Sequence, residues 1–329
     1  MNVLITGAHG FVGKHVLRSL SWLTNQPSGG PGTCNIFAPD KDSLNLLDRV
    51  RLAEYLGINE INTIVHLAAR VGGIGANKRE PADFLYNNLL MGINVLREAQ
   101  LQPHVKKVIN VGTICSYPKF ASVPFQESEL WNGFPEETNA PYGIAKRAII
   151  MYGIALNNQN SFPVVNLMPV NMAGEHDNFH PMSSHVIPAI ILKIDKAMDS
   201  NKPFVELWGT GEATREFLYA GDFAEAVRIA LTKNDITPHP INIGTGKEIT
   251  IKDLAFKIKD MMDYDGEIRF TGQVSDGQPR RCLDVNKARD VLGFEAKTKL
   301  STILLKEIEY YRAMKKEHPE YISTYKEMI

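Results

Sequence analysis

Three evenly spaced glycines near the start of the chain constrain its fold more than any other feature. Gly7, Gly10 and Gly13 follow an apolar run at residues 3–6, and a stretch of helical character, residues 14–23, comes after them. A strand, a glycine turn and a helix in this order are typical of a dinucleotide-binding unit. The glycines let the backbone approach a pyrophosphate, and the helix N-terminus offers it free N–H groups. The pattern therefore predicts an α/β protein with a Rossmann-type, doubly wound parallel sheet.

Further apolar runs along the chain fit the buried parallel strands of such a sheet. These runs cover residues 35–38, 62–69, 107–111, 164–169 and 242–244. A long helical pattern spans residues 82–100, and we expect it to neighbour the helix that carries Tyr142. Apolar outer faces on these two helices would form the interface of a homodimer. Residues 25–33, rich in Gly and Pro, are expected to form a loop.

The composition is that of an ordinary globular protein. The chain has 329 residues, 44% of them hydrophobic, and a formal net charge of −1. It can therefore form two sizeable cores, and it has no charge excess that would favour nucleic acid or an anionic membrane. Three cysteines do not make a disulfide framework, which indicates a reducing compartment such as the cytoplasm. We expect residues 1–6 to form a strand and not a signal peptide, and no run approaches the roughly 18 apolar residues of a membrane-spanning helix.

Tyr142 and Lys146 form a candidate catalytic pair. They lie four residues apart in a helical pattern and so share one helix face. A free Tyr has a pKa near 10, and a nearby ammonium group would lower it toward the range of proton exchange at neutral pH. The same spacing also fits a surface Tyr and a solvated Lys. Its position after a glycine turn and a hydroxyl-bearing strand end favours the catalytic interpretation.

Thr113 and Cys115 lie where the chain leaves the apolar run at residues 107–111. Open α/β sheets bind ligands at the carboxyl ends of their strands, so we expect both side chains at the site. The Thr113 hydroxyl would hydrogen-bond the same substrate oxygen as Tyr142. A small buried apolar role is the alternative for Cys115, but its position beside Thr113 favours a chemical role.

The histidine-rich segment at residues 176–185 fits either a metal site or an acid–base group. The spacing of His176, His180 and His185 does not match structural zinc patterns, so we expect no metal. An acid–base histidine is favoured because the imidazole pKa lies near neutrality. His66, by contrast, falls within an apolar run and is expected to be a hydrogen-bonded core residue.

Residues 207–217 combine Trp208, a glycine turn and Arg215. Trp can stack on a flat base or pack on a sugar, and Arg can grip a diphosphate with two hydrogen bonds. A simple hairpin with a core Trp is the alternative. Residues 276–281 form a loop with two cations, for which a solvated basic turn is the alternative to a ligand contact.

Several short segments complete a set of motifs with the glycine turn and the Tyr142/Lys146 pair. They are Asn45–Asp48, Val71–Ile74, Pro81–Phe84, Cys115, Tyr117-Pro118, His176–Phe179, His185–Pro188, Trp208-Gly209 and Arg215–Phe217. The set resembles the extended short-chain dehydrogenase/reductases, and among them the GDP-L-fucose synthase family of GDP-4-keto-6-deoxymannose epimerase/reductases. The resemblance covers nearly the whole chain. We expect a Rossmann-type cofactor domain, residues 1–170 plus about 218–248, and a smaller, interleaved α/β domain for the nucleotide sugar, residues 171–217 plus 249–329.

The resemblance implies a role for each matching residue. The catalytic set would be Thr113 (a serine in the family), Cys115, Tyr142, Lys146 and His185. Cofactor contacts would come from Gly7, Gly10, Phe11, Val12, Gly13, Asp40, Lys41, Leu67, Ala68, Ala69, Asn88, Val111, Gly112, Tyr142, Lys146, Pro169, Asn171 and Met172. Substrate contacts would come from Asn171, His185, Val186, Lys193, Trp208, Arg215 and Arg280.

The implied cofactor is NADP(H), with NAD(H) as the alternative. Residues just past the second strand contact the adenine ribose, where a carboxylate favours a free 2′-hydroxyl. A cation there favours a 2′-phosphate, and Asp40 and Lys41 place both signs at this point. Family members also bring arginine into the glycine turn, where this chain has His9. The choice between the two cofactors therefore stays open at the level of sequence.

The implied reaction is epimerisation followed by reduction of a GDP-4-keto-6-deoxy sugar. Cys115 and His185 would exchange protons at carbons 3 and 5, while Tyr142 and Thr113 would stabilise the enolate. A nicotinamide hydride would then reduce carbon 4. One alternative is a C4 reductase, with or without epimerisation, of another GDP-4-keto sugar such as a GDP-heptose. A non-enzymatic nucleotide-binding regulatory or scaffold protein is the other, and it would not need these polar residues.

Overall fold

The structure, a computed structural model, describes residues 1–24, 34–272 and 278–327. The loop expected at residues 25–33 lies outside the described residues, as do residues 276 and 277 of the basic loop. Within the described ranges, no helix is both long enough and apolar enough to cross a membrane.

The centre of the molecule is a six-stranded sheet with the strand order β2-β1-β3-β4-β5-β9. Its strands are β1 (Asn2–Thr6), β2 (Asn35–Phe37), β3 (Thr63–His66), β4 (Lys107–Val111), β5 (Val164–Pro169) and β9 (Ile241–Ile243). All neighbouring pairs are parallel, and the order runs outward from β1 in both directions. The apolar runs form strands because a parallel sheet covered on both faces needs apolar residues throughout. The predicted α/β, Rossmann-type fold class is confirmed.

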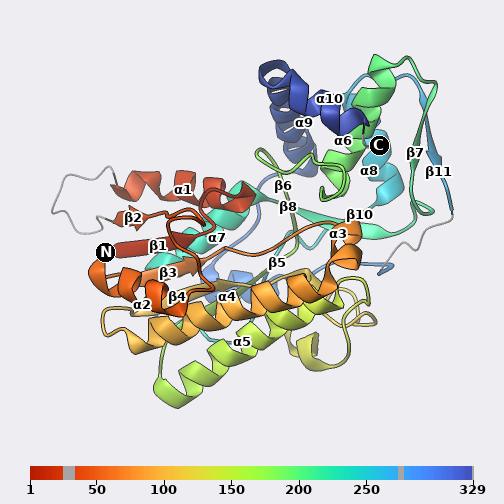
Figure 1. Cartoon of the computed structure of the whole chain (residues 1–329). Coiled ribbons are helices and arrows are strands. Elements are labelled where there is room, and N and C mark those ends of the chain that lie inside the picture. The colour runs from red at the N-terminus through yellow and green to blue at the C-terminus, as the bar shows by residue number, and fades with distance from the viewer. Residues whose placement is uncertain (25–33, 273–277, 328–329) are drawn as a thin grey trace.

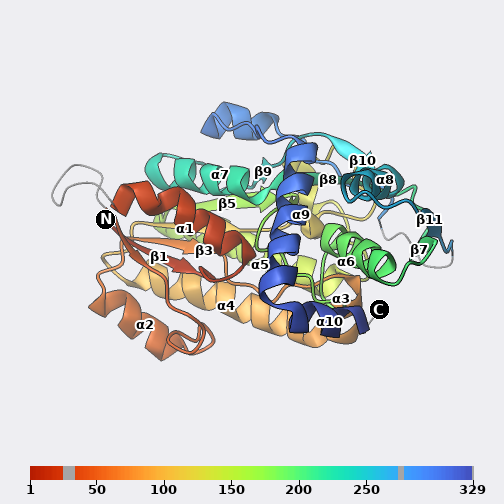
Figure 2. The same ribbon diagram turned by 90° about the horizontal axis from the view of Figure 1, so that it is seen from above.

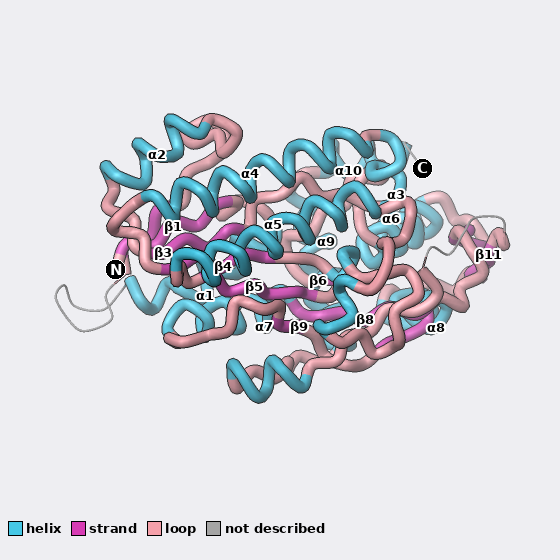
Figure 3. The backbone as a smooth tube through the Cα atoms, turned by 90° about the horizontal axis from the view of Figure 1, so that it is seen from below, coloured by secondary structure: helices cyan, strands magenta, loops and turns pink. Residues whose placement is uncertain are grey.

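Helices cover both faces of this sheet (Figure 1). On one face lie α1 (Phe11–Thr24) and α7 (Ala220–Thr232), and on the other lie α2 (Arg49–Ile58), α4 (Pro81–Leu101) and α5 (Ala140–Asn160). Side chains of β1 alternate between two core clusters, because successive strand residues point to opposite faces. Val3 and Ile5 pack in the cluster that includes α1 and α7, whereas Leu4 packs in the cluster that includes α2 and α4. The two long helices α4 and α5 lie side by side, as expected (Figure 3).

A further hydrophobic cluster gathers the C-terminal helices (Figure 2). Its helices are α6 (Val186–Asp199), α8 (Ile251–Met261), α9 (Leu300–Glu317) and α10 (Pro319–Glu327), and its parallel strand pair is β7 (Phe204–Leu207) with β11 (Glu267–Phe270). A three-stranded sheet contains β10 (Glu248–Thr250), β8 (Thr214–Tyr219) and β6 (Asn171–Ala173). β8 connects the cores, since Phe217 packs in the C-terminal cluster and Leu218 in a cluster of the main sheet.

Because β7 and β8 belong to different sheets, the simple hairpin considered for residues 207–217 is wrong. The remaining described elements are short. They are α3 (Ile74–Arg79), η1 (Ile114–Ser116), η2 (Glu127–Trp131) and η3 (Ala288–Leu292).

Candidate active site

A cavity of about 1210 Å³ extends from the glycine turn after β1 to the cluster of C-terminal helices. It lies at the carboxyl ends of the main-sheet strands, where a doubly wound sheet binds its ligands. Every residue that the sequence placed in the catalytic, cofactor and substrate sets lines this cavity, except Asn88 and Arg280. The chain thus brings together residues from nearly its full length around one space.

The glycine turn closes tightly against its neighbours. Gly7 has φ +71°, and a Cβ there would lie 2.8 Å from the Ala68 Cα. A Cβ on Gly13 would lie 2.2 Å from the Gly7 carbonyl oxygen. Gly10 donates its N–H to the same oxygen at 3.1 Å, and α1 begins directly afterwards at Phe11. A side chain at Gly7 or Gly13 would push the turn away from this backbone, so the glycines hold the N-terminus of α1 at the cavity wall as a cradle of the kind that binds a dinucleotide pyrophosphate.

The residues expected to contact the adenine ribose lie at the end of β2. The His9 Nε2 lies 2.9 Å from the Ala38 carbonyl oxygen, so the imidazole bridges the glycine turn and the segment after β2. The Asp40 carboxylate accepts the Ser43 N–H at 2.8 Å. Hydrogen bonds from Ser43 hold the pKa of Asp40 below its ordinary value. Lys41 lines the cavity beside them.

Thr113 and Tyr142 are brought together by the close approach of η1 to α5. Thr113 caps η1, and its Oγ1 accepts the Cys115 N–H at 3.2 Å. The Ser116 hydroxyl donates to the Gly143 carbonyl oxygen at 3.1 Å, which ties the two helices together. Gly143 is required for this contact, because a Cβ there would lie 2.4 Å from the Cys115 carbonyl oxygen.

The pKa of the Tyr142 phenol is raised, not lowered as the sequence analysis expected. Burial and the charge of Cys115 raise this pKa, and a hydrogen bond with Thr113 opposes them. Lys146 does not contribute to this shift, and its Nζ donates to the Val111 carbonyl oxygen at 2.9 Å. Burial lowers the pKa of Lys146 itself to about 8. The phenol therefore stays protonated at neutral pH, which is the form that can donate a proton.

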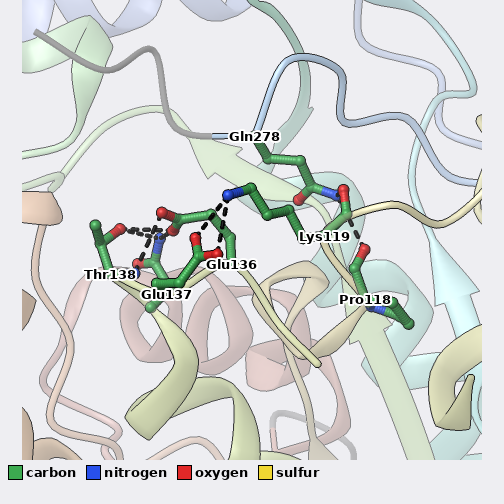
Figure 4. A network of polar contacts seen from close by, with 7 residues as sticks. Pro118, Lys119, Glu136, Glu137, Thr138 and Gln278 are labelled. Atoms are coloured by element: carbon green, nitrogen blue, oxygen red, sulfur yellow. Dashed lines mark hydrogen bonds and ion pairs between the residues drawn. The ribbon is translucent and has the colours of Figure 1, made fainter. Parts of the chain in front are cut away.

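Cys115 lies beside a buried cation that the sequence analysis did not assign. The Arg281 Nη1 lies 3.5 Å from the Cys115 sulfur, and the Arg281 Nε donates to the Gln278 Oε1 at 3.0 Å. The Gln278 Nε2 donates in turn to the carbonyl oxygens of Pro118 at 3.1 Å and Lys119 at 2.9 Å (Figure 4). These bonds fasten the Arg281 loop to the segment that follows η1. The guanidinium thus has a fixed position beside the thiol.

His185 occupies the N-cap position of α6 without a capping hydrogen bond from its side chain, which faces Asp177 instead. Its Nδ1 lies 3.5 Å from the Asp177 Oδ1, and the Asp177 side chain is only 2% exposed. The His185 side chain is 47% exposed, and it lines the cavity. Its surroundings lower its pKa by burial, but the hydrogen bond and the charge of Asp177 outweigh this effect, so the pKa is raised. A cationic imidazole at this position can act as a general acid.

The other histidines have separate partners. His176 packs its ring against Tyr310 at 4.9 Å, and His180 packs against Tyr325 at 5.3 Å. Among the residues that the structure describes, no group of three or more His, Cys, Asp or Glu side chains is placed to hold a metal ion. His66 is buried and bonds the Thr6 hydroxyl through Nδ1 at 2.9 Å, as predicted for a core imidazole.

At the far end of the cavity, α6 and the β7–β8 connection present the expected substrate residues. The Lys193 Nζ lies 5.1 Å from the centre of the Trp208 ring and donates to the Glu206 carbonyl oxygen at 3.0 Å. The Trp208 side chain is 69% exposed, so its ring is open to a ligand. Arg215 on β8 lines the same region.

Two assigned residues lie outside the lining. Asn88 is buried in α4, accepts the Arg70 N–H at 2.9 Å and donates to the Arg70 carbonyl oxygen at 3.0 Å. It therefore supports the loop after β3. Arg280 pairs with Glu248 at the surface, and its neighbour Arg281 occupies the cavity wall instead. Arg70, Asp177 and Arg281 line the cavity without having been assigned, although Asp177 lies within a segment that carries the family resemblance.

Comparison with known proteins gives consistent matches over most of the chain. The family model described as "NAD dependent epimerase/dehydratase family" matches residues 3–244. The GDP-L-fucose synthase of Escherichia coli (strain K12) is 38% identical over 87% of this chain and 88% of that protein. The GDP-L-colitose synthase of Yersinia pseudotuberculosis is 33% identical over 94% of this chain and 98% of that protein. A solved GDP-mannoheptose C4 reductase from Campylobacter jejuni with NADP bound is 25% identical, covers 94% of this chain and 98% of that chain, and superposes with a TM-score of 0.82.

Proposed function

Since this chain belongs to the NAD dependent epimerase/dehydratase family, with GDP-L-fucose synthases among its relatives, we propose that it is an epimerase/reductase of a GDP-4-keto-6-deoxy sugar. It would invert carbons 3 and 5 and reduce carbon 4, as in the synthesis of GDP-L-fucose. One observation carries the proposal: a single cavity is lined by a thiol, an imidazole, a phenol and a glycine cradle. Proton exchange and reduction both need these groups within reach of one sugar.

The cradle of Gly7 and Gly13 fits a nicotinamide dinucleotide, because a Cβ on either glycine would meet neighbouring backbone and displace the N-terminus of α1, which would bind the pyrophosphate. Bound there, the cofactor supplies a hydride for the sugar carbonyl. We propose NADP(H) as the preferred form. The His9 imidazole and the Lys41 ammonium are the candidates to contact the 2′-phosphate, while the Asp40 carboxylate accepts a hydrogen bond from Ser43. Initial rates with NADPH and with NADH, each over a range of concentrations, test this preference.

Protons on the carbons next to a ketone are acidic because the enolate spreads its charge onto oxygen. We assign the acid and base of the two inversions to Cys115 and His185. Thr113 and Tyr142 would donate hydrogen bonds to the enolate oxygen, a preorganised form of stabilisation. When carbon 4 is reduced, the protonated Tyr142 phenol would deliver a proton to the same oxygen. The negative charge would then lie on the Tyr142 phenolate, where the Lys146 ammonium would stabilise it.

The GDP moiety would be held at the far end of the cavity. Trp208 and Lys193 provide an open aromatic face and a cation, and Arg215 provides a guanidinium that suits a diphosphate. Arg281, and not Arg280, is the loop cation in position to contact the sugar. We therefore propose that residues 1–170 plus about 218–248 form the cofactor domain, and residues 171–217 plus 249–329 the nucleotide-sugar domain.

The assembly and the compartment are also proposed. Leu85 and Tyr86 on α4 and Ile144 and Met151 on α5 are large exposed apolar side chains on the paired helices. They support a homodimer built on these two helices. Cys34, Cys115 and Cys282 form no disulfide in the described part of the chain, which supports the cytoplasm as the compartment.

The decisive experiment follows deuterium and NADPH together. The protein is incubated in deuterated water with GDP-4-keto-6-deoxymannose and NADPH, and the product is analysed by NMR. Deuterium at carbons 3 and 5 with NADPH consumption supports the proposal. NADPH consumption without label indicates a simple C4 reductase, and repeating the assay with a GDP-4-keto-heptose tests that function. No reaction with either sugar contradicts the proposal and favours a binding protein.

Single substitutions test the proposed roles of Cys115 and Tyr142 in the same assay. Cys115→Ala should abolish label at one of the two carbons, and Cys34→Ala, a buried thiol outside the cavity wall, is the matched control. Tyr142→Phe should slow NADPH consumption by roughly 100-fold or more, the usual scale of a lost general acid. A Tyr142→Phe variant that reduces the sugar at the wild-type rate would exclude the phenol as the proton donor.

A further inference from the structure

A buried carboxyl group on α9 lies behind the Asp177/His185 pair. Glu307 is fully buried, and its Oε2 accepts the Gly174 N–H at 3.0 Å. Its Oε1 has no hydrogen-bond partner among the described residues. Asp177 shows the same asymmetry, since its Oδ1 accepts the Asn178 N–H at 2.7 Å and faces His185, while its buried Oδ2 has no described partner. Asp177 also donates its N–H to the Gly174 carbonyl oxygen at 3.4 Å, so Asp177 and Glu307 both bond to Gly174. Each of these two carboxyl groups presents one buried oxygen without a described partner, and so does Glu175 through its Oε2.

In the part of the chain that the structure describes, no positively charged side chain near Glu307 is placed to neutralise it if it were ionised beside the Asp177 carboxylate. The cation next to it on α9, Lys306, is bonded to Glu175 at 3.0 Å, and Glu175 also accepts the Tyr219 hydroxyl at 3.1 Å. The ring of His176 packs on Tyr310. No cation pairs with Glu307 among the described residues of α9, β6 and the loop at residues 174–178.

A buried carboxylate without a cation is costly, and two carboxylates at one site do not both ionise near neutrality. The pKa of Glu307 is accordingly raised well above its ordinary value, first by burial and then by the charges of Asp177 and Glu175. A protonated carboxyl group has an O–H to donate, and the unpaired oxygens of Glu307 and Asp177 supply one donor and one acceptor.

We propose that Glu307 is a neutral carboxylic acid that donates its O–H to Asp177, and that it thereby positions Asp177 and limits the basicity of His185. The proposal rests on the acid–base role assigned to His185 above. Asp177 accepts the Nδ1–H of His185, which leaves the Nε2 of the imidazole to exchange protons with the substrate. The hydrogen bond from Glu307 withdraws part of the Asp177 charge, so the imidazolium releases its proton more readily. Glu307 touches no substrate and acts as a positioning residue.

Two substitutions of Glu307 distinguish a protonated side chain from an ionised one. Glu307→Gln keeps a neutral N–H donor toward Asp177 and an oxygen for the Gly174 N–H. We expect the titration of His185 in this variant to stay within about 0.3 pH units of wild type. Glu307→Leu removes the donor and should raise the midpoint of that titration by roughly one pH unit, a tenfold change in proton affinity. Glu309→Gln, the same change on the exposed face of α9, is the matched control.

The titration is followed by NMR on protein labelled with ¹³C at histidine, with the His185 resonance assigned by its loss in His185→Asn. Infrared difference spectra at pH 7 provide a second readout. If Glu307 is protonated, Glu307→Gln should remove a carboxylic-acid band from the spectrum. If Glu307 is ionised, the same substitution should remove a carboxylate band instead. A midpoint that falls by half a unit or more in Glu307→Gln, or the loss of a carboxylate band, overturns the proposal. Thermal melting of each variant verifies that it folds.

These readouts need neither sugar nor cofactor. If the protein fails to turn over any GDP-4-keto sugar but shows the carboxylic-acid band and the expected midpoints, the proposed function fails and the Glu307 assignment stands. If it epimerises the sugar but Glu307 is ionised, the assignment fails alone. In an active protein, Glu307→Leu should also displace the pH profile of deuterium incorporation toward higher pH, and a merely structural role would lower the rate without moving that profile.

Discussion

At the scale of single residues, the protonation of His185 results from two opposing effects. Burial disfavours the charged imidazole, and Asp177 favours it through a hydrogen bond and its charge. Because the second effect prevails, the pKa is raised and His185 keeps its proton to higher pH than a free histidine. A protonated imidazole can donate a proton, which supports the acid role proposed for His185, with Cys115 as the proposed base at the same carbon.

Asp177→Asn should reverse this balance. The substitution removes the negative charge and leaves the effect of burial, so the pKa of His185 should fall below its ordinary value. We expect deuterium incorporation at pH 7 to slow by about tenfold or more, with the pH optimum moving to lower pH. Asp260→Asn, an exposed change on α8, serves as the control. An unchanged pH profile in Asp177→Asn would show that Asp177 does not tune the imidazole.

The lowered pKa of Lys146 predicts an upper pH limit for the reductive step. Its pKa is lowered to about 8 by burial, so the ammonium is present below that pH and is lost above it. NADPH consumption at saturating sugar should fall as pH rises through about 8, and Lys146→Arg should move this limb to higher pH. An unfolded lysine keeps its proton up to about 10.5, so the unfolded state binds more protons between these values and the free energy of unfolding should rise with pH in that window. A flat rate profile from pH 7 to 9.5 would contradict the role of the ammonium.

The sequence identified side chains whose neighbours are close in the chain, and it could not identify those held by distant ones. Tyr142 and Lys146 share a helix face, and Thr113 and Cys115 follow a strand end, so their spacing was informative. Arg281 meets Cys115 across 166 positions, and Glu307 reaches Gly174 across 133. The direction of the Tyr142 pKa also depends on burial, which a list of residues does not contain.

At the scale of elements, the close contact between η1 and α5 sets the geometry of the site. Gly143 lets the backbone of η1 approach the first turns of α5, so that Thr113 and Tyr142 share a hydrogen bond. The order of strand, glycine turn and helix predicted the sheet because each of these elements is determined locally. The 3₁₀ turn of η1 was not predicted, since it depends on a glycine 27 positions away from Ser116.

Gly143→Ala should therefore damage both reactions while the fold persists. The new Cβ would meet the Cys115 carbonyl oxygen at 2.4 Å, and η1 would have to move away from α5. We expect a loss of roughly 10- to 100-fold in NADPH consumption, because small displacements of reacting groups are costly. Gly153→Ala on the same helix is the control, because its new Cβ would crowd the Val164 side chain at 2.8 Å but would meet no backbone of η1. Equal activities of the two variants would refute a special role of the η1–α5 contact.

At the scale of the whole molecule, one cavity joins residues from the main sheet and from the C-terminal cluster. A ligand at either end stabilises the folded state by mass action, and a concentration of 100 times its Kd adds about 2.7 kcal/mol. The sequence predicted both ends of this cavity from separate motifs. It could not predict which loop cation faces inward, since Arg280 and Arg281 are adjacent and only their packing distinguishes them.

NADP⁺ and GDP should each raise the melting temperature by several degrees, and their effects should be separable. Trp208→Ala removes an exposed ring at the substrate end and should abolish most of the shift with GDP while keeping the shift with NADP⁺. Trp131→Ala, an exposed indole outside the cavity wall, should keep both shifts. Differential scanning fluorimetry measures all of these, and loss of both shifts in Trp208→Ala would contradict the assignment of the two ends.

The position of β9 at the rim of the main sheet has a consequence for synthesis on the ribosome. β5 ends at Pro169, but its partner β9 begins only at Ile241, after the chain has built α6, β7, β8 and α7. A nascent polypeptide that stops short of Ile241 exposes the unpaired backbone of β5, a surface to which a second nascent chain can add. Translation past this point closes the gap, so we expect the growing protein to be prone to pairing with another chain in the interval between these two strands.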